Sequence, residues 1–399
     1  MNRRIFLQKT ALASAALWIP NFLYGFDTAQ PLASSRSGKI LVVVQFSGGN
    51  DGLNTIVPFR NDLYYKKRPS LGIAPDKVLK IGAELGFNPA LAALQPIFDD
   101  GAMTVINSVG YPNPDRSHFR SMDIWHTASG SENYLPTGWL GRYLDSQCAD
   151  CAKPHYALEV DDSLSLALKG NSRNGFAMSN IKQLQRATNQ PFLKNLIEQT
   201  PAEHAQHNVA YLYKTLADTQ QSAKYLYQKS KVHPSITPYP ATEIGRDLQQ
   251  IAELITADAD TRIYYVSLGG FDTHVKQRKQ QEKLLQQYAE AMAAFVKDLK
   301  HNQLLDETLI MTFSEFGRRV SENASGGTDH GTANNVFLMG GQLKKQGFYN
   351  AAASLSDLDN GDLKYDIDFR RIYATIIEGW LGGEAKPILG SSFQKMDWL

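Results

Sequence analysis

The chain has 399 residues, of which 43% are hydrophobic and 20% are charged, and its formal net charge is +1. This composition is typical of a soluble globular protein, and the length suffices for one large α/β domain. The near-balance of 41 Lys and Arg residues against 40 Asp and Glu residues argues against a nucleic-acid-binding protein. No segment is long and apolar enough to span a bilayer, so no stable membrane span is expected.

The N-terminus resembles a bacterial twin-arginine export signal. Residues Arg3–Lys9 (RRIFLQK) carry paired arginines followed by Phe and Leu, and a short apolar stretch follows at Ala11–Ile19. That stretch is shorter than the roughly 20 apolar residues of a membrane-spanning helix. We therefore expect residues 1–35 to be signal and linker, with the export machinery as a partner and a periplasmic or otherwise exported product. The alternative is the basic amphipathic N-terminus of a cytoplasmic protein.

Two cysteines, Cys148 and Cys151, stand in a C-A-D-C sequence. In an oxidising compartment they form a local disulfide or remain free thiols. A redox or metal site is the alternative, although no second C-x-x-C pair is present to complete a zinc site.

Residues 36–399 are expected to form one domain around a mostly parallel sheet. Five apolar, β-branched runs have the length and composition of buried strands: Lys39–Phe46, Ala102–Val109, Thr261–Leu268, Thr308–Phe313 and Asn335–Met339. Amphipathic segments between and after them predict helices, the longest being Gln277–His301. The fold class is therefore a doubly wound α/β sheet flanked by helices. Polar, helical residues at about 185–258 are interpreted as an insertion or a lid.

Acidic and imidazole side chains follow three of these strands. In chain order they are Asp51, then Asp272 with His274, then Glu315 followed by Asp329 and His330. Loops that leave parallel strands meet at one edge of a sheet, and carboxylates beside imidazoles suit a divalent metal. We expect one or two ions of zinc, manganese, calcium or magnesium. In the alternative, Asp51 only shapes an Asn-Asp-Gly turn, and Asp272 or Thr273 caps the next helix.

A serine stands where the second strand gives way to a helix. Ser117 follows two prolines, and Arg116, His118 and Arg120 crowd the same turn. The start of a helix favours an anion or an alkoxide, so this turn is typical of a serine nucleophile in an oxyanion-binding pocket. The alternative is that Ser117 is simply the helix N-cap.

This order of acids, serine and histidines resembles the alkaline phosphatase and sulfatase superfamily. More narrowly, FSGGNDGLN, RSHFRSMDIW, GGFDTH, SEFGRR and TDHGTAN resemble the domain of unknown function 1501 family of exported bacterial proteins. The resemblance implies an alkaline-phosphatase-like fold, with Ser117 as nucleophile and Asp51, Asp272, His274 and His330 as metal ligands. Glu315 stands where an aspartate usually precedes a histidine, and Phe316 replaces that histidine. This departure points to a single metal, or to Asp329 standing in as a ligand.

The function expected from these features is an exported, metal-dependent hydrolase of phosphate or sulfate esters, with a small anionic ester as substrate. Ser117 attacks the ester, Arg116 and Arg120 take up charge, and His118 positions a water or the leaving group. The main alternative is a non-catalytic binding or assembly protein of the cell envelope. An oxidoreductase is disfavoured, because no G-x-G-x-x-G follows the first strand and no haem or iron–sulfur cysteine pattern is present.

Overall fold

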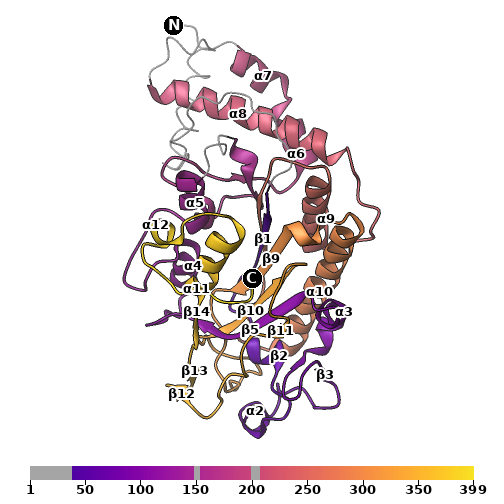
Figure 1. The fold of residues 1–399 in the computed structure, drawn as a ribbon, viewed down its shortest axis with the longest axis vertical. Helices are drawn as coiled ribbons and strands as arrows, with labels where there is room; N and C mark the ends of the chain where they lie inside the picture. Colours follow the sequence, from indigo (N-terminus) through magenta and orange to yellow (C-terminus); the bar gives the residue numbers. More distant parts are fainter. Residues whose placement is uncertain (1–37, 148–152, 199–206) are drawn as a thin grey trace.

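The computed structural model describes residues 38–147, 153–198 and 207–399 (Figure 1). The proposed export signal, Cys148 and Cys151 lie outside the described residues. Nine strands form the central sheet, in the order β11-β5-β10-β9-β1-β8-β6-β7, with β14 paired to β5. Their bounds are β1 Ile40–Phe46, β5 Met103–Gly110, β6 Ala157–Val160, β7 Phe176–Ala177, β8 Ile263–Leu268, β9 Thr308–Ser314, β10 Asn334–Met339, β11 Gly347–Phe348 and β14 Ile367–Asp368.

The sheet is mostly parallel. The central strand β1 pairs in parallel with β8 on one side and with β9 on the other. Among the described strands of this sheet, β10 alone runs against its neighbours β9 and β5. The predicted fold class is thus confirmed, and the five predicted strands are found within two residues of their expected ends.

Helices cover both faces of the sheet, as the apolar sequence of β1 requires. All seven residues of β1 are buried, and their side chains alternate between two cores. Val42 and Val44 pack with α9 (Glu243–Thr256) and α10 (Gln277–His301) on one face. On the other face, Leu41 and Val43 share a core with four helices: α4 His118–Thr127, α5 Trp139–Gln147, α11 Phe369–Thr375 and α12 Ala385–Leu389.

The long helix α10 shows how a polar sequence forms a core helix. Its buried side chains Leu285, Tyr288, Met292, Phe295 and Leu299 recur every three or four residues and therefore make one apolar stripe. The remaining positions are mostly charged or amide side chains. α10 begins at Gln277, with Lys276 in a left-handed conformation at its N-cap.

The remaining strands and α-helices pack against this three-layer body, and some of them add buried side chains to one of its two cores. They are a small sheet of β2 Ile56–Val57, β3 Leu79–Lys80 and β4 Gly86–Phe87, the hairpin of β12 Leu358–Asp359 and β13 Asp362–Leu363, and the helices α2 Asp62–Lys67, α3 Gln95–Asp99, α6 Ile181–Thr188, α7 Pro191–Glu198 and α8 His207–Ser230. Helices α6, α7 and α8 gather at one end of the molecule (Figure 1). Whether residues 185–258 act as an insertion or lid stays a prediction.

The sequence pattern predicts helices at Asn88–Phe98 and Asp368–Leu381, and both differ in detail in the structure. The segment Asn88–Phe98 is a 3₁₀ helix, Pro89–Leu94, followed by the short α3. The C-terminal helix continues from α11 into a π-helical turn, Ile376–Trp380. Among the described helices, none is both long and apolar enough to cross a membrane.

The register of the central strands brings three loops together. Phe46 at the end of β1 lies opposite both Leu268 at the end of β8 and Ser314 at the end of β9. Because these strands are parallel, their following loops leave the same edge of the sheet. The chain returns to that edge at Asn334, where the antiparallel β10 begins.

Candidate metal centre

Glycines let the loop after β1 lie against its neighbours. Gly48 has φ +119°, and a Cβ built there would lie 2.4 Å from the backbone nitrogen of Asp272. Gly49 has φ +69°, and its Cβ would overlap the ring of Phe316. Both positions therefore combine a left-handed backbone with a close approach, and each needs glycine.

A buried arginine joins these loops. The side chain of Arg318 is 0% exposed. It donates to the carbonyl oxygens of Gly49 (2.6 Å), Thr328 (2.9 Å) and Phe271 (3.0 Å), and it pairs with Asp272 at 2.8 Å. Arg318 therefore fixes the carboxylate of Asp272 relative to the loops after β1, β8 and β9. Sequence reasoning missed this role, although Arg318 lies within the SEFGRR segment.

Three imidazoles converge on one carboxylate oxygen. Asp272 Oδ1 lies 3.0 Å from Nε2 of His274, 3.2 Å from Nε2 of His330 and 3.4 Å from Nε2 of His118. The Nε2 atoms of His274 and His330 are 2.9 Å apart. Ligand atoms of His118, Asp272 and His330 all lie within 4.8 Å of one another, a spacing that could hold a metal ion. We call His118, Asp272, His274 and His330 the histidine cluster.

The opposite ring nitrogen of each histidine faces an oxygen. Nδ1 of His118 lies 2.9 Å from Glu315, and Nδ1 of His330 lies 2.8 Å from the carbonyl oxygen of Arg116. Nδ1 of His274 lies 3.6 Å from Asp329. Acceptors at Nδ1 favour the tautomer whose Nδ1 carries the proton, which leaves Nε2 as a lone-pair donor. The same arrangement of outer oxygen, imidazole and metal is common at protein metal sites.

The charges of the cluster favour a bound cation. Burial alone would raise the pKa of Asp272, but the hydrogen bond and the positive charge of Arg318 act against burial, and the pKa is lowered to about 2. Burial lowers the pKa of His330, so this imidazole is neutral at pH 7. The hydrogen bond to Glu315 raises the pKa of His118 above its ordinary value. Lone pairs of several imidazoles and a carboxylate that face one point repel one another unless a proton or a cation lies between them.

The donor set suits zinc better than calcium or magnesium. His118, Asp272 and His330 offer two imidazole nitrogens and one carboxylate oxygen, and the imidazole of His274 lies 2.9 Å from that of His330. Donors of these kinds are ones that zinc accepts. Calcium and magnesium prefer oxygen ligands throughout. The residues present therefore fit a single ion of the zinc type.

Aromatic packing closes one side of the cluster. The ring of Phe316 lies 4.8 Å, between ring centroids, from the rings of both His118 and His330. Phe316 is buried and carries no ligand atom. Phe316 therefore packs against the two imidazole rings and supplies no ligand atom for a second ion.

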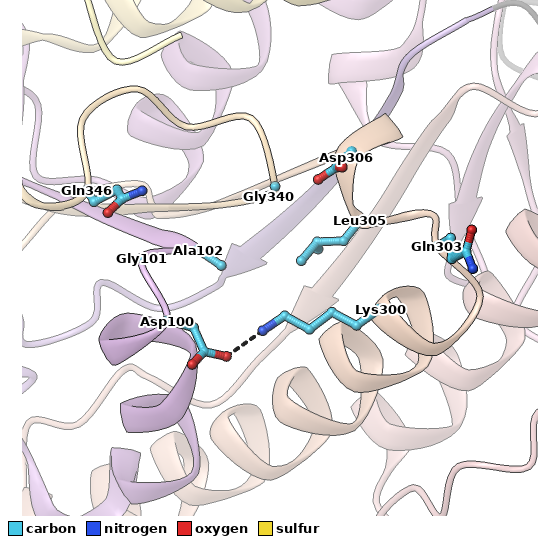
Figure 2. A pocket seen from close by; sticks show the side chains of 10 residues that line it. Asp100, Gly101, Ala102, Lys300, Gln303, Leu305, Asp306, Gly340 and Gln346 are labelled. Carbon is cyan, nitrogen blue, oxygen red and sulfur yellow. Dashed lines mark hydrogen bonds and ion pairs between the residues drawn. The ribbon is translucent and has the colours of Figure 1, made fainter.

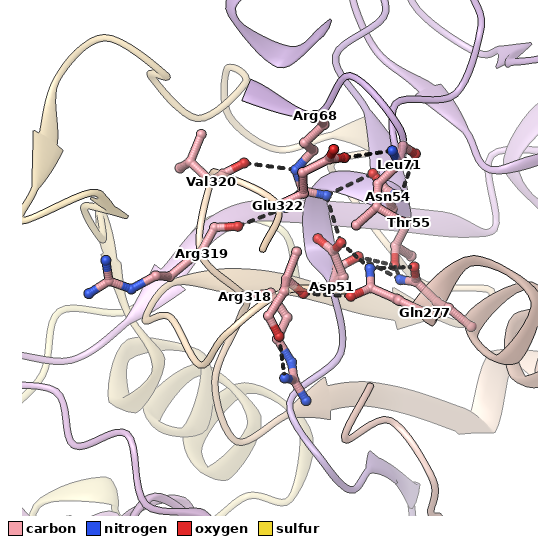
Figure 3. Close-up of polar contacts among 12 residues, drawn as sticks. Asp51, Asn54, Thr55, Arg68, Leu71, Gln277, Arg318, Arg319, Val320 and Glu322 are labelled. Carbon is pink, nitrogen blue, oxygen red and sulfur yellow. Dashed lines mark hydrogen bonds and ion pairs between the residues drawn. The ribbon is translucent and has the colours of Figure 1, made fainter. Parts of the chain in front are cut away.

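Asp51 belongs to a separate buried network (Figure 3). Its carboxylate pairs with Arg68 at 2.6 Å and also accepts from Gln277. Arg68 in turn donates to Asn54 (2.7 Å) and to the carbonyl oxygen of Val320 (2.9 Å). Asp51 thus faces a cation supplied by the chain itself, and the structure does not place it in the histidine cluster. Sequence reasoning gave no role to Arg68, because nothing local links it to a residue 17 positions earlier.

Glu315 and Asp329 contact histidines of the cluster and do not face Asp272 themselves. Glu315 accepts from His118 and from the backbone nitrogen of Gly48 at 2.8 Å. Asp329 faces His274 and accepts from Asn323 at 3.1 Å. Both orient imidazoles in this structure, whereas we had expected direct ligands. His118, expected to position a water or leaving group, lies with the candidate ligands instead.

Ser117 directly precedes His118, a member of the histidine cluster. It is the N-cap of α4, it is exposed, and its hydroxyl makes no capping hydrogen bond. The residue before it, Arg116, holds His330 through its carbonyl oxygen, and the residue after it is His118. The hydroxyl therefore has no capping partner among the described residues, and it lies at the positive end of the α4 dipole, next in sequence to His118.

Arg120 has a structural role in this structure. Its guanidinium donates to the carbonyl oxygens of Ser131 (2.8 Å) and Asn133 (2.7 Å), and it stacks on the ring of Tyr134. These contacts hold the loop after α4. α10 begins five residues after Asp272, and no side chain caps its start. Neither Asp272 nor Thr273 therefore caps this helix.

A cavity of about 500 Å³ lies elsewhere, near the start of β5 and β9 (Figure 2). An ion pair between Lys300 and Asp100, 2.7 Å long, crosses it. The other polar side chains on its walls are Gln303, Asp306 and Gln346. This cavity is at the amino ends of the strands, opposite the histidine cluster, and no imidazole lines it.

Fold and site together define a class: an α/β protein with a mostly parallel sheet and a candidate metal centre at the carboxyl ends of its strands. The chain belongs to the family described as "Protein of unknown function (DUF1501)", which it matches over residues 78–378. This confirms the narrower resemblance seen in the sequence. No curated protein matches the chain.

Solved structures similar to this one include a sulfatase, a phosphonate monoester hydrolase and a periplasmic domain. The PsFucS1 sulfatase from Pseudoalteromonas sp. is 10% identical, with 90% of this chain and 71% of that chain covered and a TM-score of 0.41. The phosphonate monoester hydrolase SpPMH from Silicibacter pomeroyi is 10% identical, with 91% and 78% covered and a TM-score of 0.39. The periplasmic domain of EcEptC from Escherichia coli, in complex with Zn, is 11% identical, with 77% and 74% covered and a TM-score of 0.35.

Proposed function

We propose that this protein is an exported, metal-dependent hydrolase of phosphate or sulfate esters. The observation that carries the proposal is the convergence of three imidazole Nε2 atoms on Asp272 Oδ1, each within 3.4 Å. Each of these imidazoles also has an oxygen facing its Nδ1 atom. Such closely spaced donor atoms repel one another, and a bound divalent cation relieves that repulsion.

His118, Asp272, His274 and His330 would hold the ion, for which zinc is a better fit than calcium or magnesium. Bound there, the ion supplies Lewis-acid stabilisation of the charge that builds up on the ester oxygens. Glu315 orients His118, and Arg318 orients Asp272, so that both keep their place when substrate arrives.

Ser117 is the proposed nucleophile. Its exposed hydroxyl attacks phosphorus or sulfur, its proton passes to the departing ester oxygen, which leaves as the alcohol, and the start of α4 favours the negative charge. Water then hydrolyses the seryl ester, which releases phosphate or sulfate and restores Ser117. Arg116, directly before it, supplies positive charge at the mouth of the site. Arg120 is left out of this scheme, because its donors are bound to loop carbonyls.

Export through the twin-arginine pathway is part of the proposal. It is supported by the paired arginines and short apolar stretch at the N-terminus. A metal-containing enzyme gains from this route, because it can fold and load its ion before crossing the membrane. The proposed site of action is the periplasm, on a small anionic ester.

A second candidate is a non-catalytic envelope protein that binds a ligand at this site. Two observations favour it. Phe316 supplies no donor beside the cluster, and Asp51 is paired with Arg68, so the described residues offer ligands for one ion only. A protein that uses its single ion to bind an anionic ligand without turning it over fits the same geometry.

Elemental analysis and a substrate screen separate these candidates. The mature protein, purified folded, is analysed for bound metal and then assayed on phosphate monoesters, phosphate diesters and sulfate esters. Ser117→Ala is compared with Ser172→Ala, an exposed serine outside the cluster. One ion per chain, with turnover lost only in Ser117→Ala, supports the hydrolase. Bound ion without turnover supports the binding protein, and folded protein that takes up no ion contradicts both.

A further inference from the structure

A short hairpin places a carboxylate beside the site. β12 and β13 are joined by Asn360 and Gly361, whose φ angles are +52° and +90°. An Asn-Gly pair with both φ angles positive is the favoured two-residue turn of a β-hairpin. The turn delivers Asp362 at the start of β13, with its side chain 0% exposed.

Two half-exposed arginines meet on this buried carboxylate. Arg116 contacts Oδ2 of Asp362, and Nε of Arg319 lies 3.7 Å from Oδ1. The arginine side chains are 42% and 36% exposed. A Cβ built at Gly361 would lie 3.5 Å from Nη1 of Arg319, so this guanidinium lies along the glycine of the turn.

Both arginines are attached to the histidine cluster through their backbones. The carbonyl oxygen of Arg116 accepts from Nδ1 of His330 at 2.8 Å. The backbone nitrogen of Arg319 donates to the carbonyl oxygen of Asp329 at 3.0 Å, one residue before His330. Figure 3 shows the side chain of Arg319 extending away from the buried network that holds Arg68 and Arg318. Both arginines therefore stand on backbone that also holds the segment of His330, and we call their guanidiniums, together with Asp362, the rim of the candidate metal centre.

The charges of this rim are not balanced internally. Two guanidiniums face one carboxylate, and Oδ1 of Asp362 has no hydrogen-bond partner among the described residues. Burial raises the pKa of Asp362, and Arg116 and Arg319 act against that rise. Asp359, on the same hairpin, is exposed and adds a solvated negative charge. A buried carboxylate costs desolvation free energy and adds little to stability. Its pairing with Arg116 and Arg319 therefore indicates that Asp362 positions these two guanidiniums.

We propose that Arg116 and Arg319 form an anion-binding subsite beside the histidine cluster, held in place by Asp362. The subsite selects esters whose alcohol part carries a second negative group, such as a carboxylate or a further phosphate. Each guanidinium has five N–H donors in a planar fork, and the contact with Asp362 leaves several of them facing solvent. The inference rests on the proposed function, because the first anionic group is the ester held at the cluster.

Binding of non-hydrolysable analogues tests the subsite without relying on turnover. Phenylphosphonate and the three isomers of carboxyphenylphosphonate are titrated calorimetrically into metal-loaded protein. The isomers cover different separations between the phosphonate and the carboxylate. We expect at least one isomer to bind roughly tenfold more tightly than phenylphosphonate, the gain of one charge-assisted hydrogen-bonded pair.

Variants of Arg319 identify the source of that gain. Arg319→Gln should abolish the preference and leave phenylphosphonate binding unchanged, while Arg319→Lys should restore only part of it. Arg246→Gln, which removes an exposed arginine on α9, is the matched control. Asp362→Asn keeps both guanidiniums and should reduce the preference through lost positioning.

The possible binding results separate a failure of the subsite from a failure of the proposed function. Phenylphosphonate and all isomers binding equally, in wild type and in Arg319→Gln, overturns the subsite and leaves the proposed function standing. A preference that survives Arg319→Gln also overturns it. If no phosphonate binds to protein that takes up no metal, the proposed function fails, and the subsite fails with it.

Discussion

The carboxylate of Glu315 lies 2.9 Å from Nδ1 of His118 and also accepts from the backbone nitrogen of Gly48 at 2.8 Å. One buried side chain therefore links the loop after β1, the end of β9 and the start of α4. Because Nδ1 of His118 is engaged, its Nε2 is free to face Asp272.

Replacing Glu315 by Gln should weaken metal binding while the fold persists. Glutamine keeps the shape but removes the negative charge that strengthens the imidazole as a ligand, and losing such a partner typically costs roughly 10- to 100-fold in affinity. The measurement is the zinc dissociation constant, obtained by competition with a chromophoric chelator. Glu290→Gln, at an exposed position of α10, is the control and should not change it. Equal affinity in all three proteins would show that Glu315 does not support a ligand.

Replacing Arg318 by Met should destabilise the whole edge of the sheet. The change leaves the carbonyl oxygens of Gly49, Phe271 and Thr328 without their donor and Asp272 without its ion pair. We expect a loss of about 3 kcal/mol or more in the free energy of unfolding, measured in urea. Arg319→Met, at the next and half-exposed position, should change it by less than about 1 kcal/mol. Similar values for the two variants would contradict the role assigned to Arg318.

Removing Arg68 should cost more than removing Arg68 and Asp51 together. The side chains of this pair are 0% and 1% exposed, so Arg68→Met leaves an unpaired buried carboxylate, at about 3–5 kcal/mol. Adding Asp51→Asn removes that charge and should recover part of the loss. A double-mutant cycle in urea measures the coupling. Additive losses would indicate that the pair is not coupled, and that Asp51 is free to serve another partner.

The pH dependence of stability should report on Glu159. This residue of β6 is buried, and burial raises its pKa to about 8, partly offset by a hydrogen bond from Ser165. The folded pKa lies above the unfolded value of about 4.5, so the contribution of Glu159 is complete below pH 4.5 and is lost as the pH rises toward 8.

The comparison of wild type with Glu159→Gln isolates that effect. Glutamine does not titrate, so the wild type should lose stability relative to the variant between pH 5 and pH 8, by an amount on the order of 3 kcal/mol. Urea unfolding at each pH gives the difference. A difference that stays constant over this range would mean that Glu159 is ionised in the folded protein at pH 5.

The strands and the edge that carries the site could be predicted, because both depend on local pattern. β1, with the sequence ILVVVQF, is apolar at nearly every position, which specifies a strand buried on both faces. Parallel strands then place Asp272, His274 and His330 at one edge, where the structure brings them together. The convergence of the loops at that edge could be expected from the parallel arrangement of the strands alone, because it does not depend on any one residue.

The partners of each side chain could not be predicted, because they are set by tertiary packing. Asp51 stands where the strand pattern placed it, yet its partner Arg68 comes from the end of α2. His118 was expected to act on substrate, and only the direction of its ring places Nε2 at Asp272. Asp362 begins the two-residue strand β13, which is too short to give a strand pattern in the sequence, and its importance depends on two arginines far away in the chain.

X-ray absorption spectroscopy of the zinc-loaded mature protein tests the histidine cluster most directly. We predict one zinc ion per chain, with imidazole nitrogens at about 2.0–2.1 Å and multiple-scattering features from about three imidazole rings, reduced in His118→Ala. Protein that binds no stoichiometric ion, or a bound ion whose spectrum lacks imidazole scattering, would contradict a metal centre built from His118, Asp272, His274 and His330.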